Sequence, residues 1–151
     1  MALALDLNNE VFSSFLFYAT LLLLKMYAVA ILTGQLRLRR KAFANPEDSL
    51  RHGGLKFCRE DADVERCRRL HHNDMECIYP FLFIGALYCM LDPSPSIARL
   101  HFRIFFLARL VHTVAYLFAV KAPTRSLAYT VGQIPCFSMA FKIVVNVASY
   151  W

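Results

Sequence analysis

Apolar residues gather in long stretches along the chain, and the first stretch runs from Val11 to Leu36, interrupted mainly by Lys25. About 20 consecutive apolar residues of helix cross a bilayer core, so this stretch is long enough to span a membrane. Asp6 and Glu10 stand where a cleaved signal peptide has its basic start. We therefore predict a membrane helix that is retained in the protein.

Three further stretches predict helices. Ile78 to Leu91 is apolar but short, and it joins the charged stretch from Val64 to Glu76 into one long helix whose first turns lie in water or inside a bundle. Ile97 to Val120 and Leu127 to Tyr150 are each long enough to span. None of these stretches alternates strictly between apolar and polar residues, as the strands of a membrane barrel do. Helices must therefore make the backbone hydrogen bonds that lipid cannot supply.

The pattern therefore predicts an all-α integral membrane protein, a four-helix transmembrane bundle that forms a single domain over residues 1–151. The predicted helices cover approximately 11–37, 63–91, 97–120 and 125–149, and a polar loop covers 38–62.

Composition agrees with a membrane protein, since 58% of the residues are hydrophobic. The formal charge is +6, which suits a membrane surface or an anionic small ligand, and the apolar stretches argue against nucleic acid. The five cysteines form no CxxC pair, so we predict neither a disulfide framework nor a zinc site. No other set of residues has the spacing of metal ligands, and no metal is expected.

The basic residues of the connections all fall on one side of the predicted bilayer. Four spans place both termini and the loop at Asp92 on one side, and the segments at 37–63 and 121–125 on the other. Lysines and arginines near helix ends mark the cytosolic side. Both termini are thus predicted to be luminal. The basic residues of the cytosolic side are Arg37, Arg39, Arg40, Lys41, Arg51, Lys56, Arg59, Lys121 and Arg125.

Three of the predicted helices carry a polar face. Ionisable groups within a span cost about 2.5–3.5 kcal/mol each, so they face a bundle interior or a wet cavity. The helix directions place the three faces at one depth near the cytosolic surface, which predicts a pocket. An ion pair of Arg109 that only holds the helices together is the alternative. The faces comprise Arg69, His72, Asn73 and Glu76; Arg109, His112, Thr113 and Tyr116; and Arg125, Ser126, Tyr129 and Gln133.

The residue types of this pocket suit a small, net-anionic, zwitterionic molecule. Arginines pair with carboxylates, and a carboxylate such as Glu76 pairs with an ammonium group. The first turn of the last helix, with Ser126, favours an anion. Glutathione has two carboxylates, one amino group and a thiol, and therefore fits this pattern.

Several motifs resemble the MAPEG family, and the resemblance runs from about Lys25 to Met139. Within the family, the chain is most similar to the branch that isomerises prostaglandin H2. The motifs are Lys25-Met26-Tyr27, LTGQLRLRRKAFANPED over 32–48, Val64-Glu65-Arg66-Cys67, Asn73-Asp74-Met75-Glu76, HTVAYL over 112–117 and Ala122-Pro123-Thr124-Arg125-Ser126.

The resemblance implies a homotrimer in the endoplasmic reticulum or perinuclear membrane, with glutathione bound between subunits near the cytosolic face. It implies glutathione contacts from Arg37, Asn73, Glu76, His112, Tyr116, Arg125, Ser126 and Tyr129. The polar faces add Arg69, His72 and Arg109 to this set. One position departs from the family branch, which has arginine where this chain has His72.

The implied reaction is the conversion of prostaglandin H2, a lipid endoperoxide that enters from the bilayer, to prostaglandin E2. Ser126 would stabilise the glutathione thiolate and Arg125 the charge that develops on oxygen. Asp48 is either the base, held by Arg125 as an ion pair, or only orients Arg125.

Two other functions remain open. The first is a general microsomal glutathione transferase or peroxidase, although those proteins have cysteine where this chain has Ser49. The second is a non-catalytic scaffold that presents lipids.

Overall fold

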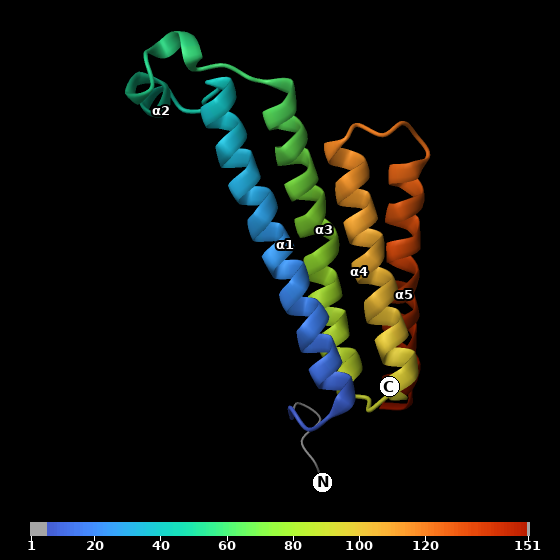
Figure 1. Ribbon diagram of the computed structural model, residues 1–151. Coiled ribbons are helices and arrows are strands. Elements are labelled where there is room, and N and C mark those ends of the chain that lie inside the picture. Colours follow the sequence, from blue (N-terminus) through green and yellow to red (C-terminus); the bar gives the residue numbers. More distant parts are fainter. Residues whose placement is uncertain (1–5, 151) are drawn as a thin grey trace.

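The computed structural model describes residues 6–150 as a bundle of four long helices with a small cap at one end (Figure 1). The long helices are α1 (Glu10–Arg40), α3 (Ala62–Cys89), α4 (Pro95–Leu117) and α5 (Thr124–Val147). A 3-10 turn, η2 (Ala148–Tyr150), follows α5. The described residues are helical apart from their connections and one isolated bridge, so the predicted all-α class is confirmed.

The cap corrects the prediction of a loop over 38–62, because it contains a fifth α-helix and a 3-10 turn. These are α2 (Pro46–Arg51) and η1 (Leu55–Phe57). Proline at the first helical position and two acidic residues in the first turn favour a helix start at this point. With six residues, α2 is too short for its periodicity to be recognised in the sequence.

Local signals set the ends of the long helices. The side chain of Asn9 accepts hydrogen bonds from the first turn of α1, and Asp61 caps α3 in the same way. At its other end, α1 stops at Lys41, whose left-handed backbone (φ 45°) turns the chain into the cap. Pro95 begins α4.

The four long helices run side by side, with α1 next to α3 and α4 next to α5 (Figure 1). The start of α1, the α3–α4 connection and the end of α5 lie at one end of the bundle. The cap and the α4–α5 connection lie at the other end. The polar faces predicted on three helices therefore all lie toward the capped end.

Three helical segments of the described chain are long and apolar enough to cross a membrane: α1, α4 and the segment Thr124–Tyr150. The charged first half of α3 makes this helix too polar to meet the same criterion of length and hydropathy. The helix nevertheless packs against α1, α4 and α5. The outward faces of the bundle also carry large exposed apolar side chains, including Phe83, Phe137 and Phe141. Such a surface is suited to lipid rather than to water.

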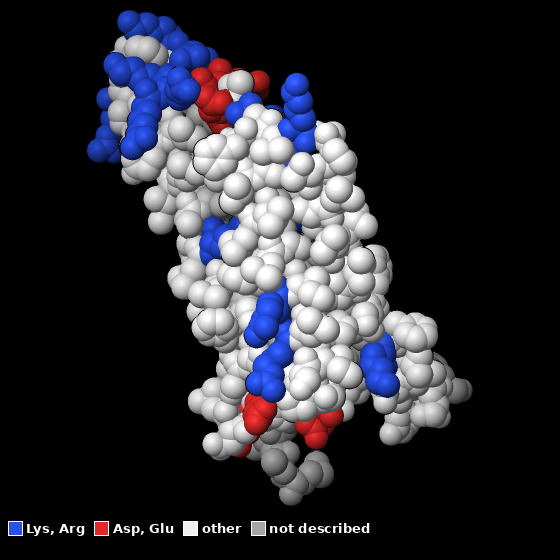
Figure 2. Space-filling model, turned by 45° about the vertical axis from the view of Figure 1, so that its right-hand side comes forward, with Lys and Arg blue, Asp and Glu red and all other residues white. Residues whose placement is uncertain are grey.

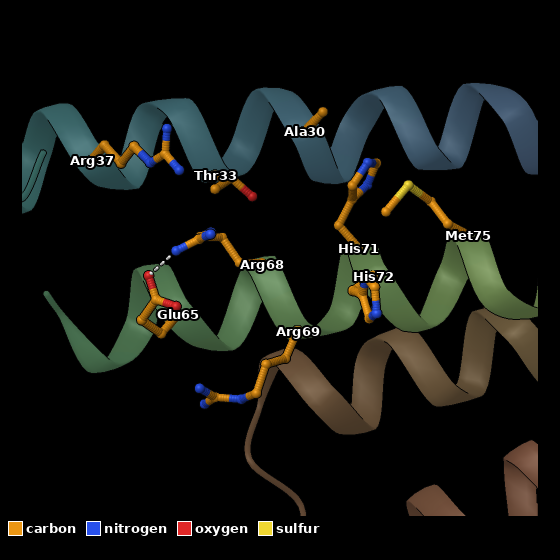
Figure 3. A pocket seen from close by; sticks show the side chains of 9 residues that line it. All are labelled: Ala30, Thr33, Arg37, Glu65, Arg68, Arg69, His71, His72 and Met75. Carbon is orange, nitrogen blue, oxygen red and sulfur yellow. Dashed lines mark hydrogen bonds and ion pairs between the residues drawn. The ribbon is translucent and has the colours of Figure 1, made fainter. Parts of the chain in front are cut away.

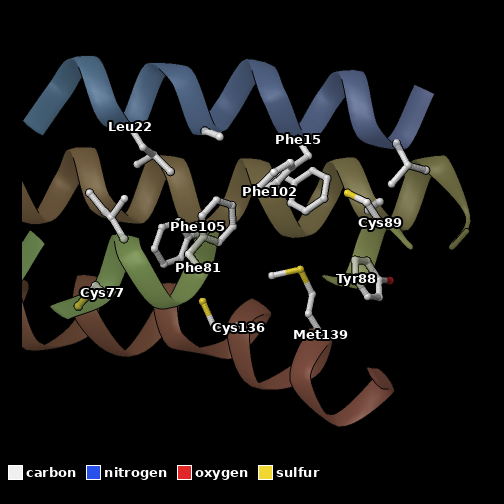
Figure 4. Close-up of a cluster of buried hydrophobic side chains, with 14 of the residues drawn as sticks. Phe15, Leu22, Cys77, Phe81, Tyr88, Cys89, Phe102, Phe105, Cys136 and Met139 are labelled. Carbon is white, nitrogen blue, oxygen red and sulfur yellow. The ribbon is translucent and has the colours of Figure 1, made fainter. Parts of the chain in front are cut away.

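The core of the bundle is built around stacked aromatic rings (Figure 4). The rings of Phe81 and Phe105 are parallel, with centroids 4.0 Å apart, and Phe102 packs against Phe81 and Phe15. Gly85 allows α1 and α3 to approach, because a Cβ at this position would lie 2.5 Å from the Phe15 ring. This core fixes the helices beneath the polar region at the capped end.

Candidate functional site

Three ionisable side chains meet inside the bundle below the cap. Asp74 of α3 accepts hydrogen bonds from Lys25 of α1 and Arg109 of α4, each at 2.5 Å and both on Oδ1. The side chains of Asp74 and Arg109 are 0% and 1% exposed, and that of Lys25 is 9% exposed. Two positive charges therefore share one carboxylate, and the group joins three helices.

Arg109 extends this buried group toward α5. Its Nη2 also donates to Oδ1 of Asn73 at 3.0 Å. One turn further along α4, the rings of His112 and Tyr116 pack with centroids 5.6 Å apart, and the guanidinium of Arg125 lies 4.9 Å from the centre of the Tyr116 ring. Five of the predicted site residues thus form two groups of contacts that lie one turn apart on α4. Arg109 joins Asn73 of α3, and His112 and Tyr116 join Arg125 of α5.

Several buried polar atoms in this interior make no hydrogen bond within residues 6–150: Nε and Nη1 of Arg109, Oδ2 of Asp74 and Nδ1 of His112. Buried polar groups in folded proteins nearly always have a partner. These four atoms therefore need a partner from outside the described residues, such as an ordered water.

A second group of predicted residues lies in a cleft of about 510 Å³ between α1 and α3 (Figure 3). Arg68 extends from α3 into the space between the two helices, and His71 points from α3 toward α1 (Figure 3). Arg37 lines the cleft from α1. Arg68 pairs with Glu65 at 2.8 Å, and Nε of Arg37 is buried with no partner among the described residues. The residues that line the cleft are Ala30, Thr33, Arg37, Glu65, Arg68, Arg69, His71, His72 and Met75.

The remaining predicted residues lie on the outside of the single chain. Ser126 and Tyr129 are exposed on α5, and Glu76 is exposed on α3, where Nε2 of His72 lies 3.2 Å from Oε1 of Glu76. Asp48 is exposed in the cap. One chain therefore brings the polar faces to the same level but does not enclose them in one pocket.

The expected ion pair between Asp48 and Arg125 is not present within residues 6–150. Asp48 accepts from the amide of Asn45 at 3.3 Å, whereas Arg125 packs on Tyr116. The reason is geometric, because α2 extends from the end of α1 on the side of the bundle away from α5 (Figure 1).

The predicted site does not include Asp74, although a lysine within a predicted span, such as Lys25, needs an internal partner. The signal was the position of Asp74 directly after Asn73, about 100° around the helix from the polar face. Arg68 and His71 were also left out of the predicted glutathione set, and both line the cleft between α1 and α3.

A model of the MAPEG family matches residues 15–145, which include the cap and nearly all of the four long helices. The chain belongs to the MAPEG family. This confirms the resemblance inferred from the motifs, and the apolar helices agree with a membrane protein.

Named relatives of this MAPEG chain match along almost their whole length. Prostaglandin E synthase of Bos taurus is 61% identical over 144 residues, covering 95% of this chain and 94% of the bovine protein. Prostaglandin E synthase of Homo sapiens is 55% identical over 147 residues, covering 97% of each chain. Microsomal glutathione S-transferase 1 of Homo sapiens is 46% identical over 142 residues, covering 91% of this chain and 92% of that protein.

Proposed function

We propose that this MAPEG protein is a glutathione-dependent isomerase that converts prostaglandin H2 to prostaglandin E2. The observation that carries the proposal is the identity of 61% and 55% to prostaglandin E synthases of cattle and humans, over at least 95% of this chain. The identity to the microsomal glutathione transferase is lower, at 46%.

The residues of the cleft between α1 and α3 fit glutathione. Three arginines and only one glutamate line it, which suits a net-anionic ligand with two carboxylates. Arg37, which contributes a buried and unpaired Nε, and Arg69 would bind carboxylates. Glu76, on the exposed side of α3, would bind the ammonium group.

We infer that the functional unit contains neighbouring copies of the chain, because half of the proposed site opens outward from the single chain. The resemblance to the MAPEG family implies that this assembly is a homotrimer. Ser126, Tyr129 and Glu76 are exposed, and Asp48 lies far from Arg125. A neighbouring subunit would bring the cap and cleft of one chain to the exposed face of α5 on the next. Repetition of such a contact closes into a ring.

The proposed setting is the endoplasmic reticulum or perinuclear membrane, with all four long helices spanning the bilayer. The capped end would face the cytosol and both termini the lumen. The basic residues concentrated at the capped end support this orientation.

Bound glutathione supplies the thiol that opens the endoperoxide. The chain's own residues would prepare and complete this reaction. The hydroxyl of Ser126, in the first turn of α5, would donate a hydrogen bond to the sulfur and favour its anionic form. Arg125 would stabilise negative charge that develops on the substrate oxygen. The Asp48 carboxylate of the neighbouring cap would accept the proton from carbon 9.

A general glutathione transferase or peroxidase is the second candidate, favoured by the relative at 46% identity. It would conjugate a simple aryl halide faster than it isomerises prostaglandin H2. A lipid-presenting scaffold would bind lipid with no dependence on thiol.

The test is product analysis of the purified protein with prostaglandin H2, with and without reduced glutathione. We expect prostaglandin E2 above the spontaneous yield only when glutathione is present. Ser126→Ala should lower the rate by about 100-fold, a typical loss for one stabilising donor. Ser149→Ala, in η2 at the opposite end of the bundle, should have no effect. A wild-type yield equal to the spontaneous one would reject the proposal, and full activity of Ser126→Ala would reject the role of Ser126.

A further inference from the structure

The cap is a folded surface rather than a loose connection. The backbone N–H of Phe43 donates to the carbonyl of Phe57 at 3.0 Å, and the rings of Phe43 and His52 stack with centroids 4.6 Å apart. Ser49 is fully buried and donates its hydroxyl proton to the carbonyl of Pro46 at 2.7 Å. The backbone positions that carry the outer side chains of the cap are therefore held relative to one another.

Basic side chains gather on this outer surface. Nζ of Lys41 and Nζ of Lys56 lie 5.1 and 5.0 Å from the centre of the Phe57 ring, and Arg51 ends α2. Figure 2 shows Lys and Arg side chains crowded over this end of the molecule, with acidic side chains gathered beside them. Among residues 6–150, no carboxylate pairs with any of these three basic residues.

Exposed leucines alternate with these basic residues. Leu50 is 61% exposed and directly precedes Arg51, and Leu55 is 59% exposed and directly precedes Lys56. Apolar side chains set among Lys and Arg are typical of segments that lie in the headgroup region of a membrane. The leucines can enter the acyl boundary while the long basic side chains reach the phosphates.

We propose that Lys41, Leu50, Arg51, Leu55 and Lys56 form a docking surface for anionic phospholipid headgroups, here called the basic-leucine surface. The cap lies at the end of the bundle that would face the headgroups of the cytosolic leaflet, and it extends from the end of α1 beyond the outline of the single chain (Figure 1). Each basic residue near an anionic membrane strengthens binding by about fivefold. Three of them without carboxylate partners favour anionic over zwitterionic lipid. This binding is independent of glutathione and of the proposed reaction.

Cys58 provides a reporter within the cap, because it is exposed while the other four cysteines are buried. A polarity-sensitive fluorophore on Cys58 of the full-length protein in neutral detergent is titrated with short-chain phosphatidylserine or phosphatidylcholine. We expect a saturable change at lower concentrations of phosphatidylserine than of phosphatidylcholine. Equal responses to the two lipids would overturn the proposal.

Paired variants separate the basic-leucine surface from a general charge effect. Lys41→Gln with Lys56→Gln should weaken the phosphatidylserine response by about 10- to 30-fold. Lys41→Arg with Lys56→Arg, which keeps both charges, should retain it. Lys121→Gln with Lys142→Gln removes the same charge outside the cap and should also retain it. The proposal would be overturned if Lys121→Gln with Lys142→Gln weakened the phosphatidylserine response, or if Lys41→Gln with Lys56→Gln did not weaken it.

Two further control measurements test for other occupants of the basic-leucine surface. Inorganic phosphate alone should not produce the response, and a response to phosphate would indicate a site for soluble anions. The signal should not change with protein concentration in the absence of lipid. A dependence on protein concentration would indicate an interface between copies of the chain, and the lipid assignment would then be wrong.

Discussion

The carboxylate of Asp74 holds two cations in a part of the molecule where charge is poorly solvated. Lys25 and Arg109 both bind its Oδ1, so the group of three side chains retains one excess positive charge. Desolvation of ions is costly, and removal of one partner from a buried pair leaves that cost uncompensated. The outcome of a substitution therefore depends on which charge is removed.

We expect Asp74→Asn to lower the free energy of unfolding by about 3–5 kcal/mol, because two buried cations would lose their only carboxylate. Lys25→Met should cost clearly less, since it leaves Arg109 and Asp74 as a balanced pair. Thermal unfolding of both variants in the same detergent measures which of them loses more stability. A larger loss in Lys25→Met than in Asp74→Asn would contradict this account of the charge balance.

His72 is the position where this chain departs from its family branch, and it lines the cleft between α1 and α3. Histidine carries a charge only in the acidic part of the physiological range, whereas arginine is always charged. We expect His72→Arg to bind glutathione roughly fivefold more tightly at pH 8, the gain of an exposed ion pair.

Calorimetric titration with glutathione at pH 8 measures this difference for His72→Arg. Lys121→Arg exchanges one cation for another outside the cleft and serves as the control. Equal affinities of wild type and His72→Arg at pH 8 would place His72 outside the glutathione site.

At the scale of elements, the sequence predicts the long helices from their apolar stretches but not the contacts between them. An ionisable residue within a span, such as Lys25, needs a buried partner, but only the packing of α1 against α3 shows that this partner is Asp74. The helix α2 was missed because six residues contain too few turns to show a period. Asp48 and Arg125 were expected to pair, yet the direction in which the cap leaves α1 separates them, and a linear sequence does not encode that direction in any local motif.

Gly85 sets the spacing of α1 and α3. A Cβ at this position would lie 2.5 Å from the buried ring of Phe15, so we expect Gly85→Ala to lower the free energy of unfolding by about 1–3 kcal/mol. Gly34→Ala is the matched control in α1, because nothing in the described chain lies within 4 Å of its added Cβ. Thermal unfolding in detergent compares the two. Equal effects would show that the close approach at Gly85 does not limit packing.

At the scale of the whole molecule, the proposed site is divided between surfaces that one chain does not bring together. Asp48 belongs to the cap and Ser126 to the exposed face of α5. If neighbouring subunits complete each site, two different inactive chains should restore activity to each other. Co-assembly of Asp48→Asn with Arg125→Ala should then regain about one quarter of wild-type activity, since random mixing gives that share of intact interfaces.

Mixing must occur during expression, so that subunits assemble together, and prostaglandin E2 formation is the measurement. Each variant alone and a mixture of the two purified proteins serve as controls and should remain inactive. Absence of activity in the co-assembled sample would assign Asp48 and Arg125 to the same chain's site, or to no shared site.

The polar first half of α3 has a bearing on how the fold is recognised in other chains. If only strongly apolar helices are counted as membrane spans, the described chain has three. An odd number of spans would place the two ends of the chain in opposite compartments. The bundle instead brings the start of α1 and the end of α5 to the same end (Figure 1). If all four long helices cross the bilayer as proposed, epitope tags attached before α1 and after α5 would share one compartment. The fourth crossing would then be α3, which carries Asn73 and Asp74.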